Sequence, residues 1–196
     1  TVSAGILNIQ NATATGTTAG GISVTSGAAL QIQGGVSVGA EALTLNGSGI
    51  SSDGALRNIS GTNSYAGAIT LGSASRINSD AGTLTLTGGI TGSGLGLTVG
   101  GAGNTTISTS GINTSTSGTL TKDGTGTLTI TASGDYTGAT TVSAGILNIQ
   151  NATATGTTAG GISVTSGAAL EVQGGISVGA EALTLNGSGI SSGGAL

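Results

Sequence analysis

The sequence contains no cysteine, histidine, proline, methionine, tryptophan or phenylalanine, and only 5% of its 196 residues are charged. Without cysteine, neither a disulfide nor a thiolate metal site can form. Without histidine and cysteine, a Ser-His-Asp triad, a Cys-His pair and a histidine-based metal centre are also excluded. These absences remove most hydrolytic mechanisms. We therefore expect a protein that is not an enzyme and that has no catalytic, metal or cofactor-binding residues and no cofactor.

The few charges limit the partners of the chain. Three cations, Arg57, Arg76 and Lys122, stand against seven acidic residues, and the net charge is −4. This balance gives no basic footprint for nucleic acid or for anionic lipid. No apolar run approaches the ~18 residues of a membrane span. We expect no nucleic-acid partner and no membrane insertion of this segment.

Glycine and threonine dominate what is present, with 41 and 34 residues respectively. Interior glycine and β-branched residues both disfavour helices. Apolar residues instead recur at every second position in short bursts, which is strand periodicity. The clearest bursts are Ile22 and Val24, Leu30 and Ile32, Val36 and Val38, Leu43 and Leu45, Ile69 and Leu71, Leu84 and Leu86, Leu95 and Leu97, and Leu128 and Ile130. Gly, Ser, Asn and Asp clusters between the bursts predict tight corners.

Residues 1–56 reappear as residues 141–196 with four substitutions. The sequence is thus one 140-residue unit, 1–140, followed by the start of a near-identical unit, 141–196, in a single continuous solenoid without a linker. The substitutions follow the predicted strand pattern. Ile32 becomes Val172 and Val36 becomes Ile176 at inward positions, Gln31 becomes Glu171 at an outward position, and Asp53 becomes Gly193 in a turn.

Strong bursts begin near Val2, Ile22, Leu43, Ile69, Leu95, Leu120 and Val142, which predicts about six coils in each unit. At about 4.8 Å between stacked strands, about eight coils would form a rod of about 40 Å. A barrel or sandwich would also suit short strands, but Asn-Gly hairpin signals are rare here and a closed fold cannot grow by 140-residue increments. Left-handed hexapeptide coils need an aliphatic residue at every sixth position, and this chain meets that spacing once, at Leu30 and Val36, and does not continue it. The pattern favours an all-β, right-handed parallel β-helix.

Several segments carry residue types used in chemistry. Asp80, Asp123 and Asp135, with Arg76 and Lys122, are the charged groups of the central region, and we interpret them as solvated turn charges. The segment 100–105 resembles a calcium-binding nonapeptide, but Thr105 stands where a carboxylate is required. The glycines of 123–126 are better explained by a corner than by a phosphate site, because no helix follows.

Threonine recurs at alternate positions in two stretches, Thr83, Thr85 and Thr87, and Thr125, Thr127 and Thr129. Such ladders can form a flat array of hydroxyl and methyl groups, as in some ice-binding solenoids, although threonine is also the polar residue best suited to strands. Tyr65 and Tyr136 occupy the same motif position beside a glycine. We interpret them as corner plugs.

The stretch 118–131 reads Gly-Thr-Leu-Thr-Lys-Asp-Gly-Thr-Gly-Thr-Leu-Thr-Ile-Thr, and 134–148 reads Gly-Asp-Tyr-Thr-Gly-Ala-Thr-Thr-Val-Ser-Ala-Gly-Ile-Leu-Asn. Both resemble the autotransporter-associated β-strand repeat, also called the passenger-associated transport repeat. A degenerate echo, Asn-Ser-Tyr-Ala-Gly-Ala-Ile-Thr-Leu, begins at Asn63. The resemblance implies a right-handed β-helix, an extracellular or bacterial cell-surface location outside the outer membrane, and an adhesive or scaffolding role.

The expected function is a structural repeat, a spacer, stalk or fibre-forming segment of an adhesin-like surface protein that acts by length and stacking. The alternative is a surface-binding solenoid that recognises ice or glycan through a threonine-rich face. The expected partner is the chain itself, stacked end to end or in tandem, with other cell-surface components or glycans as further candidates. An uncapped solenoid cut within a unit would have open apolar ends that associate into filaments.

Overall fold

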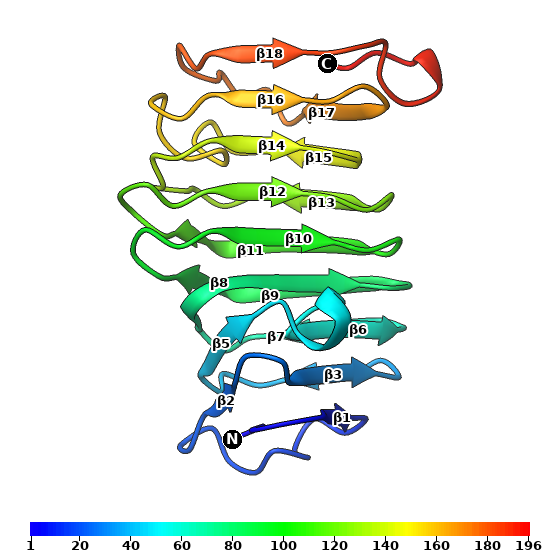
Figure 1. The fold of residues 1–196 in the computed structure, drawn as a ribbon, viewed down its shortest axis with the longest axis vertical. Helices are drawn as coiled ribbons and strands as arrows, with labels where there is room; N and C mark the ends of the chain where they lie inside the picture. Colours follow the sequence, from blue (N-terminus) through cyan, green and yellow to red (C-terminus); the bar gives the residue numbers. More distant parts are fainter.

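The computed structural model describes residues 1–196 as a β-solenoid of about eight stacked turns (Figure 1). All strand pairs are parallel, which excludes the barrel and sandwich alternatives. In Figure 1 the chain climbs while the near strands run to the right and the far strands return to the left, so the coil is right-handed. The predicted fold class is confirmed.

The strands form three faces of the rod, and the coils above β11 contribute strands to the second and third faces alone. The first face contains β2 (Ile22–Val24), β5 (Leu43–Gly47), the start of β8 (Ile69–Ser79) and the ends of β9 (Thr83–Thr91) and β11 (Asn104–Asn113). The second face contains β1 (Ile6–Ile9), β3 (Ala29–Gln33), β6 (Leu56–Ser60), the end of β8, β10 (Leu97–Gly100), β12 (Leu120–Lys122), β14 (Thr140–Val142), β16 (Ile162–Val164) and β18 (Leu183–Leu185).

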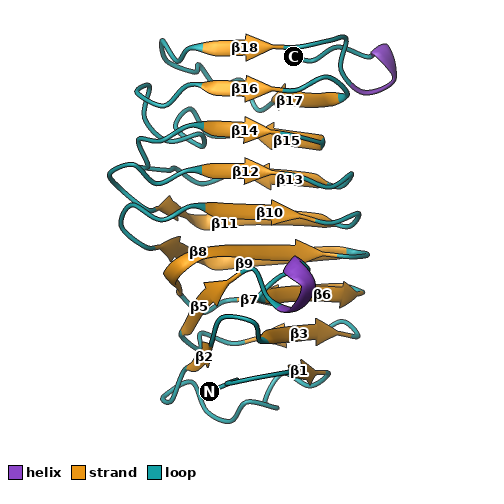
Figure 2. Cartoon of the chain, in the orientation of Figure 1, coloured by secondary structure: helices purple, strands orange, loops and turns teal.

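The third face contains β4 (Ser37–Val38), β7 (Thr62–Tyr65), the starts of β9 and β11, β13 (Thr127–Ile130), β15 (Gly145–Ile149) and β17 (Ala168–Val172). The helical segments are two short 3₁₀ turns, η1 (Ile50–Ser52) and η2 (Ile190–Ser192) (Figure 2). No helix has the length and apolar character needed to cross a membrane.

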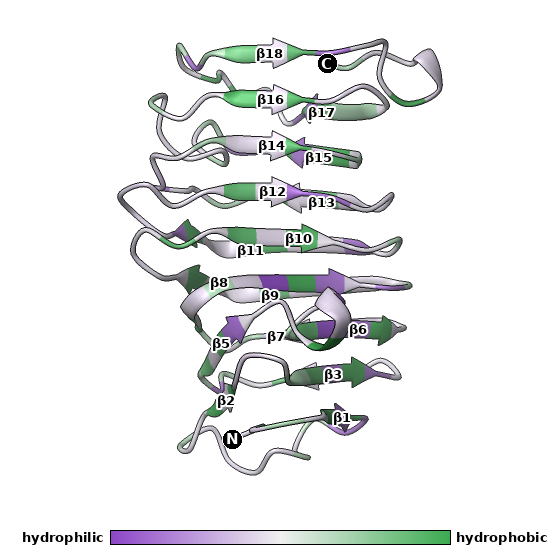
Figure 3. Cartoon of the chain, viewed as in Figure 1, coloured by the Kyte–Doolittle hydropathy of each residue, from purple (hydrophilic) through white to green (hydrophobic).

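Alternation along each strand places its aliphatic residues inside the coil. A single cluster of 37 buried residues runs through the stack, and every burst residue named above except Leu95 belongs to its buried part. Strand side chains alternate between two directions, so the inward residues of successive coils stack in columns at the ~4.8 Å spacing of the strands. In Figure 3 this core gives the hydrophobic colouring of the strands, while hydrophilic bands concentrate on β8 and β6.

The strand phase around the unit junction agrees with the sequence pattern. Leu128, Ile130, Val142, Leu147 and Ile149 are fully buried. Thr127, Thr129 and Gln150 are partly exposed. Of the two adjacent aliphatic residues, Leu147 points inward and Ile146 points outward.

Asn148 faces outward, as the alternation along its strand predicts, but neighbouring side chains cover it. Its side chain lies on the outer face but is only 7% exposed. Its Nδ2 donates hydrogen bonds to Glu171 Oε2 at 2.9 Å and to Gln173 Oε1 at 3.1 Å, and its Oδ1 accepts one from Gln150 at 2.9 Å. Long polar neighbours on the next coil therefore cover an outward asparagine.

The predicted coil starts near Leu95 and Leu120 need a correction. Ile69 pairs with Ile90 on the first face, whereas Leu97 and Leu120 pair with each other on the second. Leu95 lies outside the strands and is only partly buried. The sequence pattern could not show this change of face. Alternation of apolar residues indicates which side chains point inward, but not on which face of the rod their strand lies.

Glycine is required where corners of successive coils touch. Gly101 has a φ of 103° and Gly124 a φ of 71°, both in the left-handed region that favours glycine. A Cβ on Gly124 would collide with the backbone of Gly101, and a Cβ on Gly101 with the backbone of Ser79. The corner can therefore stack only if these positions lack a side chain.

The phase of the strand predicts that two adjacent substitutions lower the free energy of unfolding by different amounts. Leu128→Ala should lower the free energy of unfolding by about 2–5 kcal/mol, because it leaves a cavity between two coils. Thr129→Ala should cost much less, because Thr129 is partly exposed on the outer face. Denaturant unfolding of both variants measures the difference. Equal losses would mean that the strand phase is wrong.

Candidate functional site

Half of the ten charged side chains gather in one network on the second face, which we call the charge ladder. Its members are Asp53, Arg57, Asp80, Asn78, Arg76 and Asp123. Arg57 lies at one end: its Nε contacts Asp80 Oδ2 at 2.7 Å, and its Nη1 contacts Asp53 Oδ2 at 3.2 Å. Asp53 is the most exposed of these groups, at 52%. An exposed ion pair is worth about 0–1 kcal/mol, which explains why glycine is tolerated at 193.

Arg76 holds the other end of the ladder. Its Nη1 donates to Asp123 Oδ2 at 2.7 Å and its Nη2 to Asp123 Oδ1 at 2.9 Å, a bidentate pair across two coils. The same Nη2 donates to Asn78 Oδ1 at 2.9 Å, and Asn78 donates to Asp80 Oδ1 at 2.7 Å. Asp80 and Asp123 thus both accept charged hydrogen bonds, and the ladder links strands of successive coils.

Lys122 is buried, which contradicts its interpretation as a solvated turn charge. Only 2% of the residue is exposed, because it stands at an inward position between Val99 and Val142. Its Nζ donates to the carbonyls of Asp123 at 2.7 Å, Gly124 at 2.8 Å and Ala144 at 3.2 Å. Ala144 belongs to the next coil and to the second copy of the unit. Lys122 therefore ties the end of one unit to the start of the next.

Burial lowers the pKa of Lys122 to about 8, and nearby Arg76 adds to the lowering, whereas Asp123 opposes it. Burial also raises the pKa of the Tyr65 and Tyr136 hydroxyls. Both tyrosines are fully buried, as the corner-plug interpretation predicts. Tyr65 Oη donates to the Glu41 carbonyl at 2.8 Å, and Tyr136 Oη lies 2.7 Å from Thr140 Oγ1.

Asp135 lies apart from the charge ladder. It is exposed and accepts a hydrogen bond from the Ser115 amide at 2.9 Å. The structure therefore brings together Asp80, Asp123, Arg76 and Lys122 but not Asp135. No group of three or more carboxylates or other metal-type ligands occurs. Thr105, in the calcium-like segment, is 1% exposed and follows the corner at Gly101.

A polar seam inside the corner between the second and third faces was not predicted. Asn58 Nδ2 donates to Ser79 Oγ and to the Ala81 carbonyl, both at 2.9 Å, and Asn63 Oδ1 accepts from the Val36 amide at 2.6 Å. Strand alternation contained the signal, since Asn63 precedes inward Tyr65 by two residues and Lys122 follows inward Leu120 by two. The polarity of Asn63 and Lys122 suggests exposed positions, whereas their places in the alternating strands are inward.

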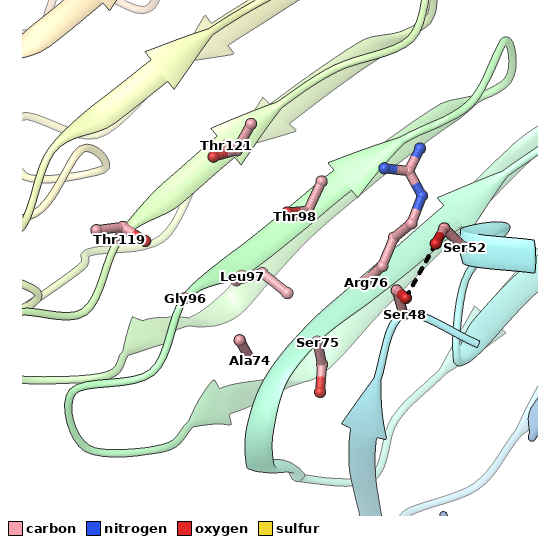
Figure 4. A pocket seen from close by; sticks show the side chains of 10 residues that line it. All are labelled: Ser48, Ser52, Ala74, Ser75, Arg76, Gly96, Leu97, Thr98, Thr119 and Thr121. Atoms are coloured by element: carbon pink, nitrogen blue, oxygen red, sulfur yellow. Dashed lines mark hydrogen bonds between the residues drawn. The ribbon is translucent and has the colours of Figure 1, made fainter. Parts of the chain in front are cut away.

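The largest surface hollow is a groove of about 340 Å³ beside the η1 turn (Figure 4). Its hydroxyl groups come from Ser48, Ser52, Ser75, Thr98, Thr119 and Thr121. Arg76 also lines it, but Asp123 and Asn78 occupy both of its Nη atoms. The groove has no aromatic wall on which a sugar could stack.

Threonine forms a regular grid on the third face. Ser64, Thr85, Thr106 and Thr129 pair in register on successive coils. Asn148 and Glu171 continue the same column, and a second column begins with Thr62, Thr83, Asn104 and Thr127 before Ile146. The ladders predicted along each strand thus also stack across coils, but the grid ends within the unit.

Parallel strands, an aliphatic interior and glycine corners define a β-solenoid made of tandem units. Within it, residues 120–149 match the family model of the passenger-associated-transport-repeat, which confirms the resemblance seen in the sequence. The match extends from β12 through β15 and crosses the junction between the two copies. Comparisons with curated proteins and with solved structures give no significant match.

Burial of Lys122 predicts a pH dependence of stability. The folded pKa of about 8 lies below the ordinary value of 10.5, so the unfolded chain binds more protons between these values. The contribution of Lys122 to the free energy of unfolding is therefore lowest below pH 8 and rises as the pH increases towards 10.5. We expect the free energy of unfolding to rise from pH 7 to about 9.5, the upper limit that avoids tyrosine ionisation.

Lys122→Met removes this group but keeps a long apolar side chain, so the rise should be absent in the variant. Unfolding of both proteins in urea at pH 7, 8 and 9.5 measures the effect, and all other titrating groups are common to both. Parallel pH profiles would contradict the buried position of the ammonium.

Proposed function

We propose that this chain is a length of stalk in a secreted or cell-surface bacterial protein, and that it acts by its length and by the stacking of its units. The repeat match and the solenoid fold support the coarser statement, a structural repeat of an autotransporter passenger. The finer proposal, a spacer or adhesive stalk, rests on how the two copies join.

The junction between the copies is the observation that carries the proposal. β12 pairs with β14 and β13 with β15, so the second copy stacks directly on the first without a linker. Lys122 adds hydrogen bonds across the same junction. Each added unit therefore lengthens the rod and extends its core, as in other repeat proteins whose stability depends on neighbouring coils. The proposed function needs no catalytic group.

The proposed partner is a further copy of the chain. The large exposed hydrophobic residues, Ile6, Leu7, Val172, Leu183, Leu185 and Leu196, all lie in the coils at the two ends of the described chain. Except for Ile146, the outward counterpart of Ile6, their counterparts in interior coils are buried. The strand edges at both ends of the described chain are unpaired. Parallel stacking has no geometric stop, so contacts of this kind build filaments rather than closed oligomers.

We expect the isolated 196-residue chain to associate end to end into fibres with a strand repeat of about 4.8 Å along the axis. Leu183→Lys/Leu185→Lys should abolish the fibres, because it places two charges on the open apolar end. Thr184→Lys/Ser188→Lys is the matched control, since it adds the same charge at outward positions and should still form fibres. Light scattering and fibre diffraction measure both. A concentrated wild-type sample that stayed monomeric would argue against the proposal.

The threonine grid favours a second candidate, a surface-binding solenoid that recognises ice or glycan. Its unshifted register from Ser64 to Thr129 is the supporting observation. Thermal hysteresis or saturable glycan binding by the Leu183→Lys/Leu185→Lys variant, together with loss of that activity in Thr106→Lys, would favour this candidate over the stalk.

A further inference from the structure

The two copies of the unit make the same internal contacts. Val2 bridges Val24 as Val142 pairs with Val164, and Ile6 pairs with Ala29 as Ile146 pairs with Ala169. Loop contacts repeat as well: Thr15 Oγ1 donates to Glu41 and Thr155 Oγ1 to Glu181, and η1 recurs as η2. Local structure is therefore a property of the unit.

The position of these elements around the rod does not repeat. β2 lies on the first face, whereas its copy β16 lies on the second, in one column with β10, β12 and β14. β3 lies on the second face, and its copy β17 lies on the third. In Figure 2 the turns η1 and η2 accordingly project at different positions around the rod.

The pairing register gives the size of this shift. On the third face, six successive pairings lead from Val38 through Tyr65, Leu86, Ile107, Ile130 and Ile149 to Val172. The repeat counterpart of Val172 is not Val38 but Ile32, which lies six residues earlier on the second face. One unit is thus six whole coils plus one face.

The length of the repeat unit need not correspond to a whole number of coils. Coil length is set locally by corner glycines and loops, which both copies share. A strand finds the same kind of parallel partner on different faces, as β2 does on the first face and its copy β16 on the second. A difference of one face therefore accumulates from unit to unit without a cost in pairing.

We infer that a tandem array of this unit is a rod with a threefold screw, in which each unit is turned by one face relative to the previous one. Every surface feature then moves to the next face at intervals of about 30 Å along the axis. After three units, about 19 coils or about 91 Å, it returns to the starting face.

This screw determines what the array presents to a partner. The charge ladder and the threonine grid each lie on one face of a unit, and on another face in the next. No side of the rod carries a continuous grid longer than one unit, so a flat lattice cannot be matched along its length. The same patch is offered in all directions at regular intervals, which suits many identical small contacts around a stalk.

Two double-cysteine variants, which have position 171 in common, test the screw directly. Spin labels attach only to the introduced cysteines, because the chain has no native cysteine. Ser37 and Glu171 lie in one column, joined by six pairings through Ser64, Thr85, Thr106, Thr129 and Asn148. Gln31 and Glu171 are repeat counterparts on different faces. The variants are Ser37→Cys/Glu171→Cys and Gln31→Cys/Glu171→Cys, each with circular dichroism matched to wild type.

Distances between the labels are measured by double electron–electron resonance. We expect about 29 Å between the Cα atoms of the Ser37 pair. The Gln31 pair should be longer by about 3–5 Å, since its labels also differ by the width of a strand face, which adds to the axial distance in quadrature. A Gln31 pair that was shorter than the Ser37 pair, or equal to it, would overturn the inference, because counterpart residues would then share a face.

Discussion

Backbone hydrogen bonds between successive coils run along the axis of the rod, and the rest of the molecule has to accommodate them. A parallel ladder holds neighbouring strands about 4.8 Å apart, so corners must stack as closely as strands do. Gly101 and Gly124 meet this requirement by lacking a Cβ. Inside the coil, the same spacing leaves room for one aliphatic residue above another, which explains why β-branched residues and leucine fill the core with only two tyrosines.

Polar groups that enter this interior are held by the backbone itself. Lys122 satisfies three carbonyls at a corner, one of them from the next unit, and Asn63 accepts from the Val36 amide. A buried polar group without a partner would cost free energy, whereas a paired one can fix the register of two coils. The arrangement couples the unit junction to the strand stack, so that tandem copying preserves a continuous core.

Much of this fold could be predicted from the sequence because its signal is local. Period-two bursts identified inward residues such as Leu128 and Ile130, and glycine clusters identified corners. Three features of the structure are not among the sequence-based expectations. Lys122 was interpreted by its charge rather than by its position two residues after Leu120. Asn148 is covered by side chains from the next coil, which no single strand reveals. The change of face between Ile69 and Leu97 is invisible to periodicity, because all three faces have the same pattern, and pairing alone distinguishes them.

In this structure the second copy of the unit extends the stack of the first without a break. Small-angle X-ray scattering on chains of one, two and three complete units, each carrying lysine substitutions at the open apolar end to prevent association, tests this continuity most directly. We expect the maximum dimension to rise by about 30 Å with every added unit while the cross-sectional radius stays constant, because six coils and one face add about that length. A maximum dimension that grew irregularly, or a cross-section that widened as units were added, would contradict the continuous stack.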